Sequence, residues 1–170
     1  MKEQTEKEFL MLLERHIGII VKIINVYAHN AQDRTDLMSD IVFELWKSYP
    51  KFKGDSQAST WLYRVALNIA LKRKRKKDNN KLLFIEDLLT FDCSTIMDTS
   101  NDGSDINLLY QCIEELKPIN KAIILLYLED KSNEEISEIT GLSRTNISTR
   151  LNRIREQLKK CMIKNEYYGN

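Results

Sequence analysis

The clearest local pattern in this 170-residue chain lies at residues 132–158, which read SNEEISEITGLSRTNISTRLNRIREQL. Ser132 and Glu135 have the spacing of a capping box, which predicts the start of a short helix. Gly141 can adopt the left-handed conformation that ends such a helix, and Ser143 can cap a second one. Two helices joined by so tight a turn are typical of a helix-turn-helix.

The second helix of this pattern has two different faces. Its inner face is an apolar stripe at helical spacing, formed by Ile147, Leu151, Ile154 and Leu158. Its outer face has no acid before Glu156 and can donate hydrogen bonds to base edges and phosphates. The candidate DNA-binding residues there are Ser143, Arg144, Thr145, Asn146, Ser148, Thr149, Arg150 and Arg153. The alternative is a helical hairpin with a merely solvated basic face, because this pattern also arises by chance.

The composition of the whole chain also favours helices. Hydrophobic residues make up 42% of it and charged residues 30%, which is enough apolar material for packed cores. Only 5 Gly and 2 Pro are present, so tight turns of sandwiches and barrels and Gly-rich phosphate loops are disfavoured. We therefore expect an all-α fold.

Apolar residues recur at helical spacing in five further stretches, and we expect a helix in each. The approximate bounds of these helices are 6–28, 34–49, 60–77, 106–116 and 118–129. Thr5 with Glu8 forms a capping box before the first, and Asp33 is the expected cap of the second. Pro118 is expected at the first position of the last.

Charge divides the chain into segments, although the formal net charge is only +1. Residues 61–77 contain seven basic residues and no acid, whereas residues 78–107 contain seven acids and one lysine. Residues 143–164 contain seven basic residues and one acid. We expect two small helical domains, 1–77 and 108–164, joined by a flexible acidic linker at 78–107, with the helix-turn-helix in the C-terminal domain. Two basic segments favour a double contact with a polyanion.

The remaining signals concern location and thiols. The chain starts with alternating charges, and its longest apolar run is interrupted by Lys22 and Asn25, so we expect a cytoplasmic protein without membrane insertion. Cys93, Cys112 and Cys161 are odd in number and widely spaced, and neither histidine lies at ligand spacing from them. We expect reduced, structurally incidental thiols, no metal and no cofactor.

Three ordered stretches are similar to one protein family. They read DLMSDIVFELWK (36–47), FKGDSQASTWLYRVALNIALKRKRK (52–76) and LKPINKAIILLYLEDKSNEEISEITGLSRTNISTRLNRIREQL (116–158). In this order they resemble parts of the sigma factors of bacterial RNA polymerase, of the compact extracytoplasmic-function type with only sigma-two and sigma-four domains. The resemblance implies a protein without an active site that binds core RNA polymerase, recognises promoter DNA and helps to melt it.

The first stretch resembles the family's contact with the clamp helices of the largest polymerase subunit. Acids recur there at every fourth position, and we expect them on the outside of a helix whose inner face includes Leu37, Ile41 and Leu45. The polymerase-binding residues that the resemblance implies are Asp36, Leu37, Asp40, Phe43 and Glu44.

The second stretch resembles the loop and helix that read and open the minus-ten element. A flipped base needs a pocket with polar edges, which Gln57 and Asn68 can supply, while the basic run can hold duplex phosphates. We expect Trp61 in the core and leave a stacking role open for Tyr63. The implied minus-ten residues are Gly54, Asp55, Ser56, Gln57, Tyr63, Arg64, Asn68, Lys72, Arg73, Lys74, Arg75 and Lys76.

The third stretch resembles the sigma-four domain, which binds the minus-thirty-five element. Asp130-Lys131 stands where the family frequently has glycine and an apolar residue. Besides core polymerase and promoter DNA, an anti-sigma factor is a possible partner.

Two rival functions come from other classes. A free-standing helix-turn-helix regulator would bind DNA without polymerase and has no use for the acidic second helix. A DNA recombinase would need a nucleophilic Ser or Tyr among clustered arginines, and only Arg15 and Arg34 precede Arg64.

Overall fold

The computed structural model describes residues 2–52, 54, 57–80 and 103–168, and every regular element in them is helical. The helices are α1 (Lys2–Tyr27), α2 (Ala31–Ser48), the short 3-10 helix η1 (Tyr49–Lys51), α3 (Ala58–Asn80), α4 (Gly103–Glu114), α5 (Pro118–Leu128), α6 (Asn133–Thr140) and α7 (Arg144–Tyr168). The prediction of an all-α fold with two helical regions is confirmed for these residues. None of the helices in the described ranges is both long and apolar enough to cross a bilayer.

The N-terminal unit is a bundle of α1, α2 and α3. Each helix turns one apolar stripe inward, so that Ile20, Ile41 and Leu62 are essentially inaccessible to water. An aromatic cluster closes one end of the bundle. There the ring of Phe9 lies edge-on to Trp46 at 5.1 Å and to Tyr49 at 5.3 Å between centroids.

The C-terminal unit is built around α5. This helix is buried over Lys121–Leu126, because α4, α6 and α7 all pack on it. Pro118 occupies its first turn as expected.

The helix-turn-helix follows its local signals closely. Ser132 and Glu135 form both bonds of the capping box, and Gly141 has a φ of 74° in the left-handed region. Ser143 caps α7, since its Oγ accepts a hydrogen bond from the Asn146 amide at 3.2 Å. These three sequence predictions are confirmed.

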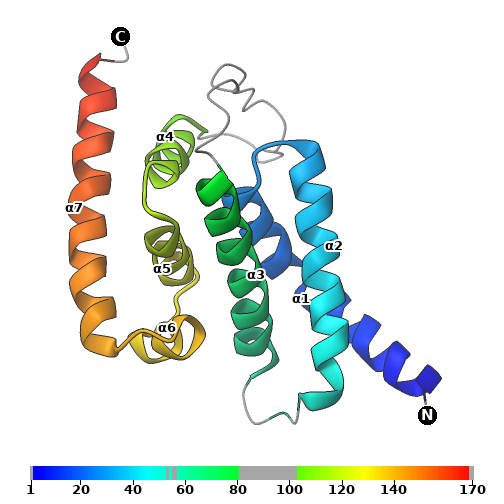
Figure 1. Ribbon diagram of the computed structural model, residues 1–170. Coiled ribbons are helices and arrows are strands. Elements are labelled where there is room, and N and C mark those ends of the chain that lie inside the picture. Colours follow the sequence, from blue (N-terminus) through cyan, green and yellow to red (C-terminus); the bar gives the residue numbers. More distant parts are fainter. Residues whose placement is uncertain (1, 53, 55–56, 81–102, 169–170) are drawn as a thin grey trace.

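The two units are packed against each other. Figure 1 shows α4 and α5 between α7 and α3, with α1 and α2 beyond α3. The Tyr27 hydroxyl of α1 donates to the Pro118 carbonyl at 2.7 Å, and Lys22 pairs with Glu129 at 2.5 Å. One hydrophobic cluster runs through both units, so the described helices share a continuous core.

Several expected helix ends are wrong. The first helix begins at Lys2, so Thr5 lies inside it and is not its N-cap. Asn30, not Asp33, caps α2, because the Asn30 side chain accepts from the Asp33 amide at 2.8 Å.

The segment between the helices that flank the expected linker is shorter than the predicted range 78–107. Helix α3 continues to Asn80 and α4 starts at Gly103, and no Gly or Pro lies between Ala58 and Asp102 to stop a helix. Residues 81–102, with Cys93, lie outside the described residues.

The expectation of incidental thiols is wrong for one pair. Cys112 of α4 and Cys161 of α7 form a disulfide, with 5.8 Å between their Cα atoms. Their separation of 49 residues hides the pair in the sequence, and only the packing of α4 on α7 brings them together.

Candidate nucleic-acid interface

The outer face of α7 is the first candidate DNA-binding surface. Most of its expected DNA-binding residues are exposed: Ser143, Arg144, Thr145, Asn146, Ser148, Thr149 and Arg153. Apolar residues such as Ile147 and Leu151 are buried between them and fix the rotation of the helix. The helix can therefore present its first three turns to a groove.

Three residues on this face are held by neighbours within the C-terminal unit. Arg150 is half-buried and donates from Nη1 to Asn120 Oδ1 of α5 at 3.0 Å. The Ser148 hydroxyl accepts from Asn133 of α6 at 3.0 Å, and Arg144 pairs with Glu134 at 2.8 Å.

Arg150 also connects the candidate residue Asn146 to a residue of α5. Its Nε donates to Asn146 Oδ1 at 2.8 Å, so the arginine links Asn146 to Asn120 of α5. Sequence reasoning missed Asn120, because no local spacing joins it to α7. The same is true of Arg155, whose guanidinium lies 4.7 Å from the centroid of the Tyr127 ring.

Helix α3 carries the second candidate surface. Arg64, Asn68, Lys72 and Arg75 are exposed and follow one another at spacings of three and four, so they lie on one face. Lys76 is exposed beside them.

The loop before α3 is described only in part. Gly54 is exposed with a φ of 76°, a conformation that suits glycine, and Gln57 is exposed immediately before the helix. Asp55 and Ser56 lie outside the described residues. Only Gln57 of the expected loop donors can therefore be placed.

The structure corrects the stacking role left open for Tyr63. Its side chain is 2% exposed, between α3 and the C-terminal unit. Burial, together with the neighbouring Glu129 carboxylate to which it hydrogen-bonds, raises the pKa of Tyr63 to about 12. A ring so enclosed cannot stack on a base in this conformation. Trp61 lies partly buried against the core, stacked on Phe52 at 4.7 Å between centroids.

Part of the α3 surface is occupied by α6. Arg64 donates to the Glu138 main-chain carbonyl from Nη2 at 2.8 Å and from Nε at 3.3 Å. The Arg64 side chain thus faces protein where the sequence suggested DNA.

The acidic face of α2 also meets α3. Arg73 pairs with Asp40 at 2.5 Å and with Asp36 at 3.8 Å. Glu44 pairs within its own helix with Lys47 at 3.8 Å. Two of the expected polymerase-binding acids thus have an internal cation as partner.

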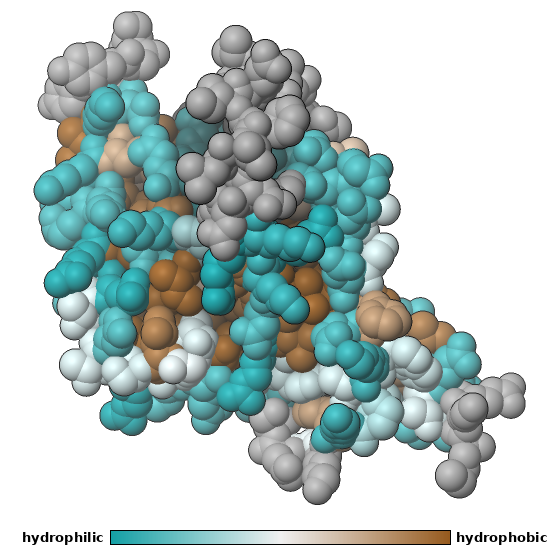
Figure 2. Space-filling model, in the orientation of Figure 1, coloured by the Kyte–Doolittle hydropathy of each residue, from teal (hydrophilic) through white to brown (hydrophobic). Residues whose placement is uncertain are grey.

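The large apolar residues of α2 near these acids divide into two groups. Leu37 is 2% exposed and belongs to the core, so the prediction that it contacts polymerase is wrong for this conformation. Phe43 is 65% exposed and Trp46 is 42% exposed, which leaves apolar surface beside the acids. In Figure 2, hydrophilic side chains cover most of the visible face, and hydrophobic ones show between α7 and α3 and near the lower parts of α1 and α2.

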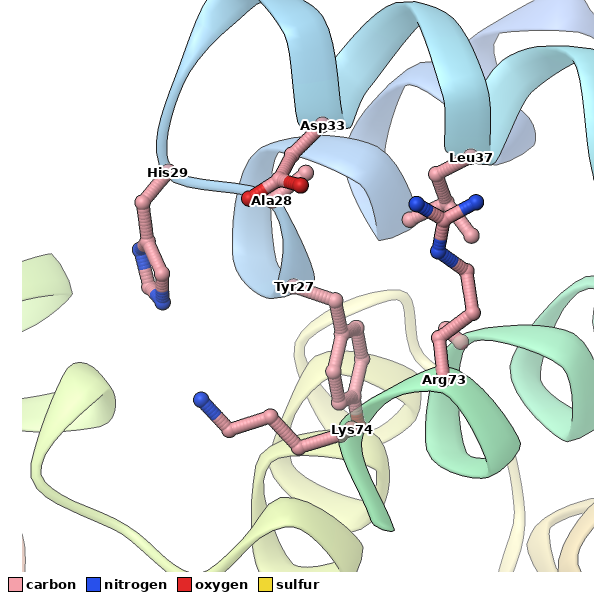
Figure 3. A pocket seen from close by; sticks show the side chains of 8 residues that line it. Tyr27, Ala28, His29, Asp33, Leu37, Arg73 and Lys74 are labelled. Carbon is pink, nitrogen blue, oxygen red and sulfur yellow. The ribbon is translucent and has the colours of Figure 1, made fainter. Parts of the chain in front are cut away.

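A small cavity marks the place where the basic run leaves the bundle. It measures about 30 Å³, room for one or two water molecules, and lies between the end of α1, the start of α2 and α3. Figure 3 shows Lys74 reaching across it on the side of His29, while Arg73 lies over Leu37.

A buried cation lies close to this place. Lys121 of α5 is 5% exposed. Burial lowers its pKa, and so does the positive charge of Lys74, while Glu114 acts in the opposite direction. Lys74 of α3 is therefore close to the buried Lys121 of the C-terminal unit.

Comparison with known proteins identifies both units. The family described as Sigma-70 region 2 matches residues 12–80, and the family described as Sigma-70, region 4 matches residues 106–158. Together the two matches cover well over half of the chain.

Curated relatives extend over most of the chain. The ECF RNA polymerase sigma-E factor of Haemophilus influenzae is 26% identical over 165 residues, covering 91% of this chain and 87% of that protein. The ECF RNA polymerase sigma factor SigW of Bacillus subtilis is 28% identical over 142 residues, covering 77% of this chain and 76% of the relative.

A solved structure shares the fold. The sigma factor RpoE of Bartonella quintana, in complex with the anti-sigma factor NepR, has a TM-score of 0.69 at 18% identity, covering 94% of this chain and 97% of that one. The matched regions lie in the order that the three sequence stretches predicted. The chain therefore belongs to the non-enzymatic sigma-70 family, as an extracytoplasmic-function sigma factor with regions 2 and 4 that acts in promoter recognition and in the initiation of transcription by RNA polymerase.

Proposed function

We propose that α2 docks on core polymerase, that α3 with its preceding loop binds the minus-ten element, and that α7 reads the minus-thirty-five element. The observation that carries this assignment is the presence of two polar, cationic helix faces, one on α3 and one on α7. A duplex contact needs such faces, because phosphates attract cations and base edges need donors and acceptors.

On α3, base reading falls to Asn68 and Gln57. Both are exposed, and an amide offers a donor and an acceptor to the edge of a flipped base. Lys72, Arg75 and Lys76 lie further along the helix and hold phosphates of the adjoining duplex without reading sequence.

On α7, Asn146 is the main candidate for base contact. It lies in the first turn, where recognition helices enter the major groove, with Thr145 and Thr149 beside it. Arg153 lies two turns further and is assigned to phosphate. Arg150 acts as a positioning residue, because its bonds to Asn120 and Asn146 hold the side chain at the helix surface.

On α2, the contact with polymerase combines charge and apolar area. Phe43 is the most exposed large apolar side chain among the described residues, and Glu44 lies next to it. Asp36 and Asp40 form ion pairs with Arg73. They can contribute to polymerase binding once Arg73 leaves them and binds a DNA phosphate.

Function also requires the two units to separate. Elements at minus ten and minus thirty-five are about 25 base pairs apart, roughly 85 Å of duplex at 3.4 Å per base pair. In the packed arrangement, however, Arg64 of α3 bonds Glu138 of α6 at 2.8 Å. Residues 81–102 can span at most roughly 75 Å when extended, which together with the lengths of the helices suits the required separation.

The division of the chain follows from this arrangement. We assign residues 1–77 to polymerase and minus-ten binding, 108–164 to minus-thirty-five binding, and 78–107 to an acidic connection whose negative charge disfavours contact with the phosphate backbone. We expect the protein to work in the cytoplasm.

An anti-sigma factor is the remaining partner that we propose. Two solved sigma-factor structures of the same fold contain one. They are the NepR complex from Bartonella quintana and CnrH with the cytosolic domain of CnrY, the latter with a TM-score of 0.66, 18% identity, and coverage of 94% of this chain and 90% of that one.

The assignment is tested by transcription in vitro with core polymerase on a library of promoters randomised at both elements. We expect transcripts only when the chain is present, with enriched motifs at both positions. Asn68→Ala should change the motif selected at minus ten only, and Asn146→Ala the motif at minus thirty-five only. Exchanged or unchanged motifs would contradict the assignment of α3 and α7.

A further inference from the structure

The disulfide between α4 and α7 lies at a site that promoter recognition does not explain. Cys112 is 1% exposed, while Cys161 is half-buried at the edge of the core. The Asn165 amide, one turn along α7, donates to the Cys161 carbonyl at 3.0 Å and lies 3.5 Å from Cys161 Sγ. Cys112 is thus enclosed, whereas Cys161 is partly open to solvent.

We propose that Cys112 and Cys161 form a reversible thiol–disulfide site that fastens α4 to α7 and so sets the stability of the DNA-reading unit. This goes beyond the proposed promoter contacts. It rests on the proposed function for the cytoplasmic location and for the assignment of α7 to DNA. Thiols are kept reduced in that compartment, so a disulfide there reports oxidising conditions.

The difference in exposure between Cys161 and Cys112 indicates which thiol reacts first. The Cys161 thiolate attacks a low-molecular-weight disulfide such as oxidised glutathione, whose S–S bond breaks, and one glutathione thiolate leaves. The Cys112 thiolate then attacks Cys161 Sγ and displaces the second glutathione thiolate. The two cysteines lose two electrons and two protons, and the oxidised glutathione becomes two thiols. A dithiol reductant reverses both steps.

Charge near Cys161 supports its role as the attacking thiol. Lys160 precedes it directly and Lys164 follows one turn later, and both are exposed. Positive charge beside a thiol stabilises its thiolate, the attacking form, and attracts anionic glutathione disulfide.

The position of the bond explains what it controls. The 49-residue separation encloses α5, α6 and α7 as far as Cys161, which includes the whole helix-turn-helix. Closing a loop of this size restricts the unfolded chain and stabilises the folded one. Because α7 is continuous from Arg144 to Tyr168, fastening its second half also holds its DNA-reading half.

The first test compares the full-length chain after treatment with oxidised glutathione and after dithiothreitol. Peptide mass spectrometry should find Cys112 linked to Cys161 only after oxidation. The melting temperature should be about 10 °C higher in the oxidised form. The variant Cys93→Ser is the matched control and should keep both effects, whereas Cys112→Ala and Cys161→Ser should lose the difference. The absence of the linkage, or equal melting of the two wild-type forms, would overturn the proposal.

The second test addresses the order of attack. Cys112→Ala should accumulate glutathione on Cys161, and Cys161→Ser should leave Cys112 unmodified while the chain stays folded. Rapid modification of Cys112 instead would overturn the assigned order.

A third measurement links the site to transcription. Chain oxidised and freed of reagent is added to core polymerase on a promoter that depends on its minus-thirty-five element. It should stay active to a higher temperature than reduced chain. Equal temperature profiles would overturn the proposal that the disulfide controls the stability of the DNA-reading unit. If the promoter assignment itself failed, the linkage found by mass spectrometry would still be present.

Discussion

The two candidate DNA-reading helices are supported in different ways. The DNA-binding candidates of α7 are held by side chains of the same unit, because Asn120 and Asn133 hydrogen-bond to them. The α3 surface is tied to other parts of the molecule, since Arg64 bonds α6 and Arg73 pairs with acids of α2. If both helices bind DNA as we propose, α7 can do so in the packed arrangement, whereas α3 becomes fully available only after its partners move away.

The largest effect is expected from the phosphate contacts of α3. Replacing Lys72, Arg75 and Lys76 together by Ala should reduce open-complex formation roughly tenfold or more on every promoter and lower its salt slope by up to about three, because fewer counterions are released. Fluorescence of a base analogue in the melted segment, recorded at several salt concentrations, measures both. The matched control neutralises Lys159, Lys160 and Lys164 on α7, beyond the reading face, and should leave the slope nearly unchanged. A wild-type slope in the α3 variant would make its basic run a merely solvated surface.

A base-reading role on both helices predicts the next effect. Asn68→Ala and Asn146→Ala should each cost roughly 1–3 kcal/mol of binding on the preferred element and less on a sequence already mismatched there. Arg153→Ala should instead weaken all minus-thirty-five sequences alike, as loss of a phosphate contact does. Competition binding with holoenzyme on single-base variants of each element measures these costs. Equal losses on all sequences for either Asn variant would assign that residue to the backbone.

The same contrast shows what the sequence could predict. The capping box at Ser132, the turn at Gly141 and the cap at Ser143 depend on residues a few positions apart, so local rules found the helix-turn-helix. The polar faces of α3 and α7 follow from helical periodicity.

Long-range packing accounts for what the sequence did not reveal. The burial of Tyr63, the pairing of Arg73 with Asp40 and the joining of Cys112 to Cys161 depend on how helices distant in the sequence meet. Leu37 is a different case, because helical spacing with Ile41 and Leu45 correctly predicted its burial, whereas similarity to a family motif suggested a polymerase contact.

The ion pair between α2 and α3 gives the third prediction. Asp40→Arg should weaken binding to core polymerase by about 1–2 kcal/mol, since it reverses a charge on the docking face and leaves Arg73 beside a second cation. Titration of labelled chain with core polymerase measures the affinity, and circular dichroism checks the helix content. The control Lys7→Ala removes an exposed charge of α1, a helix to which we assign no polymerase contact. Wild-type affinity of the Asp40 variant would remove this residue from the docking surface.

The contact between the units can be weakened at Glu129. Glu129→Gln loses the ion pair with Lys22 and weakens the bond to Tyr63, so the separated form should gain about 1 kcal/mol or less, as expected for a partly exposed pair. Small-angle scattering should show a larger radius of gyration, and α3 should bind single-stranded minus-ten DNA better without polymerase. Glu44→Gln is the matched control, because the ion pair that Glu44 forms with Lys47 lies within α2. No change in either quantity would mean that other contacts keep the units together.

The smallest effect tests how local the support of α7 is. Asp130 connects α5 to α6 with a φ of 55°, a left-handed conformation that costs a side chain free energy and that glycine adopts readily. Asp130→Gly should relieve this cost, partly offset by the greater freedom of glycine in the unfolded chain, and raise the free energy of unfolding by about 0.5 kcal/mol. Asp130→Ala is the control, since it removes the carboxylate but keeps the strain, and it should be no more stable than wild type. Urea unfolding measures both variants. If the turn supports only the C-terminal unit, salt-dependent binding through α3 should be the same in Asp130→Gly and in wild type, whereas a change there would show that the α5–α6 turn also governs how the two units fit together.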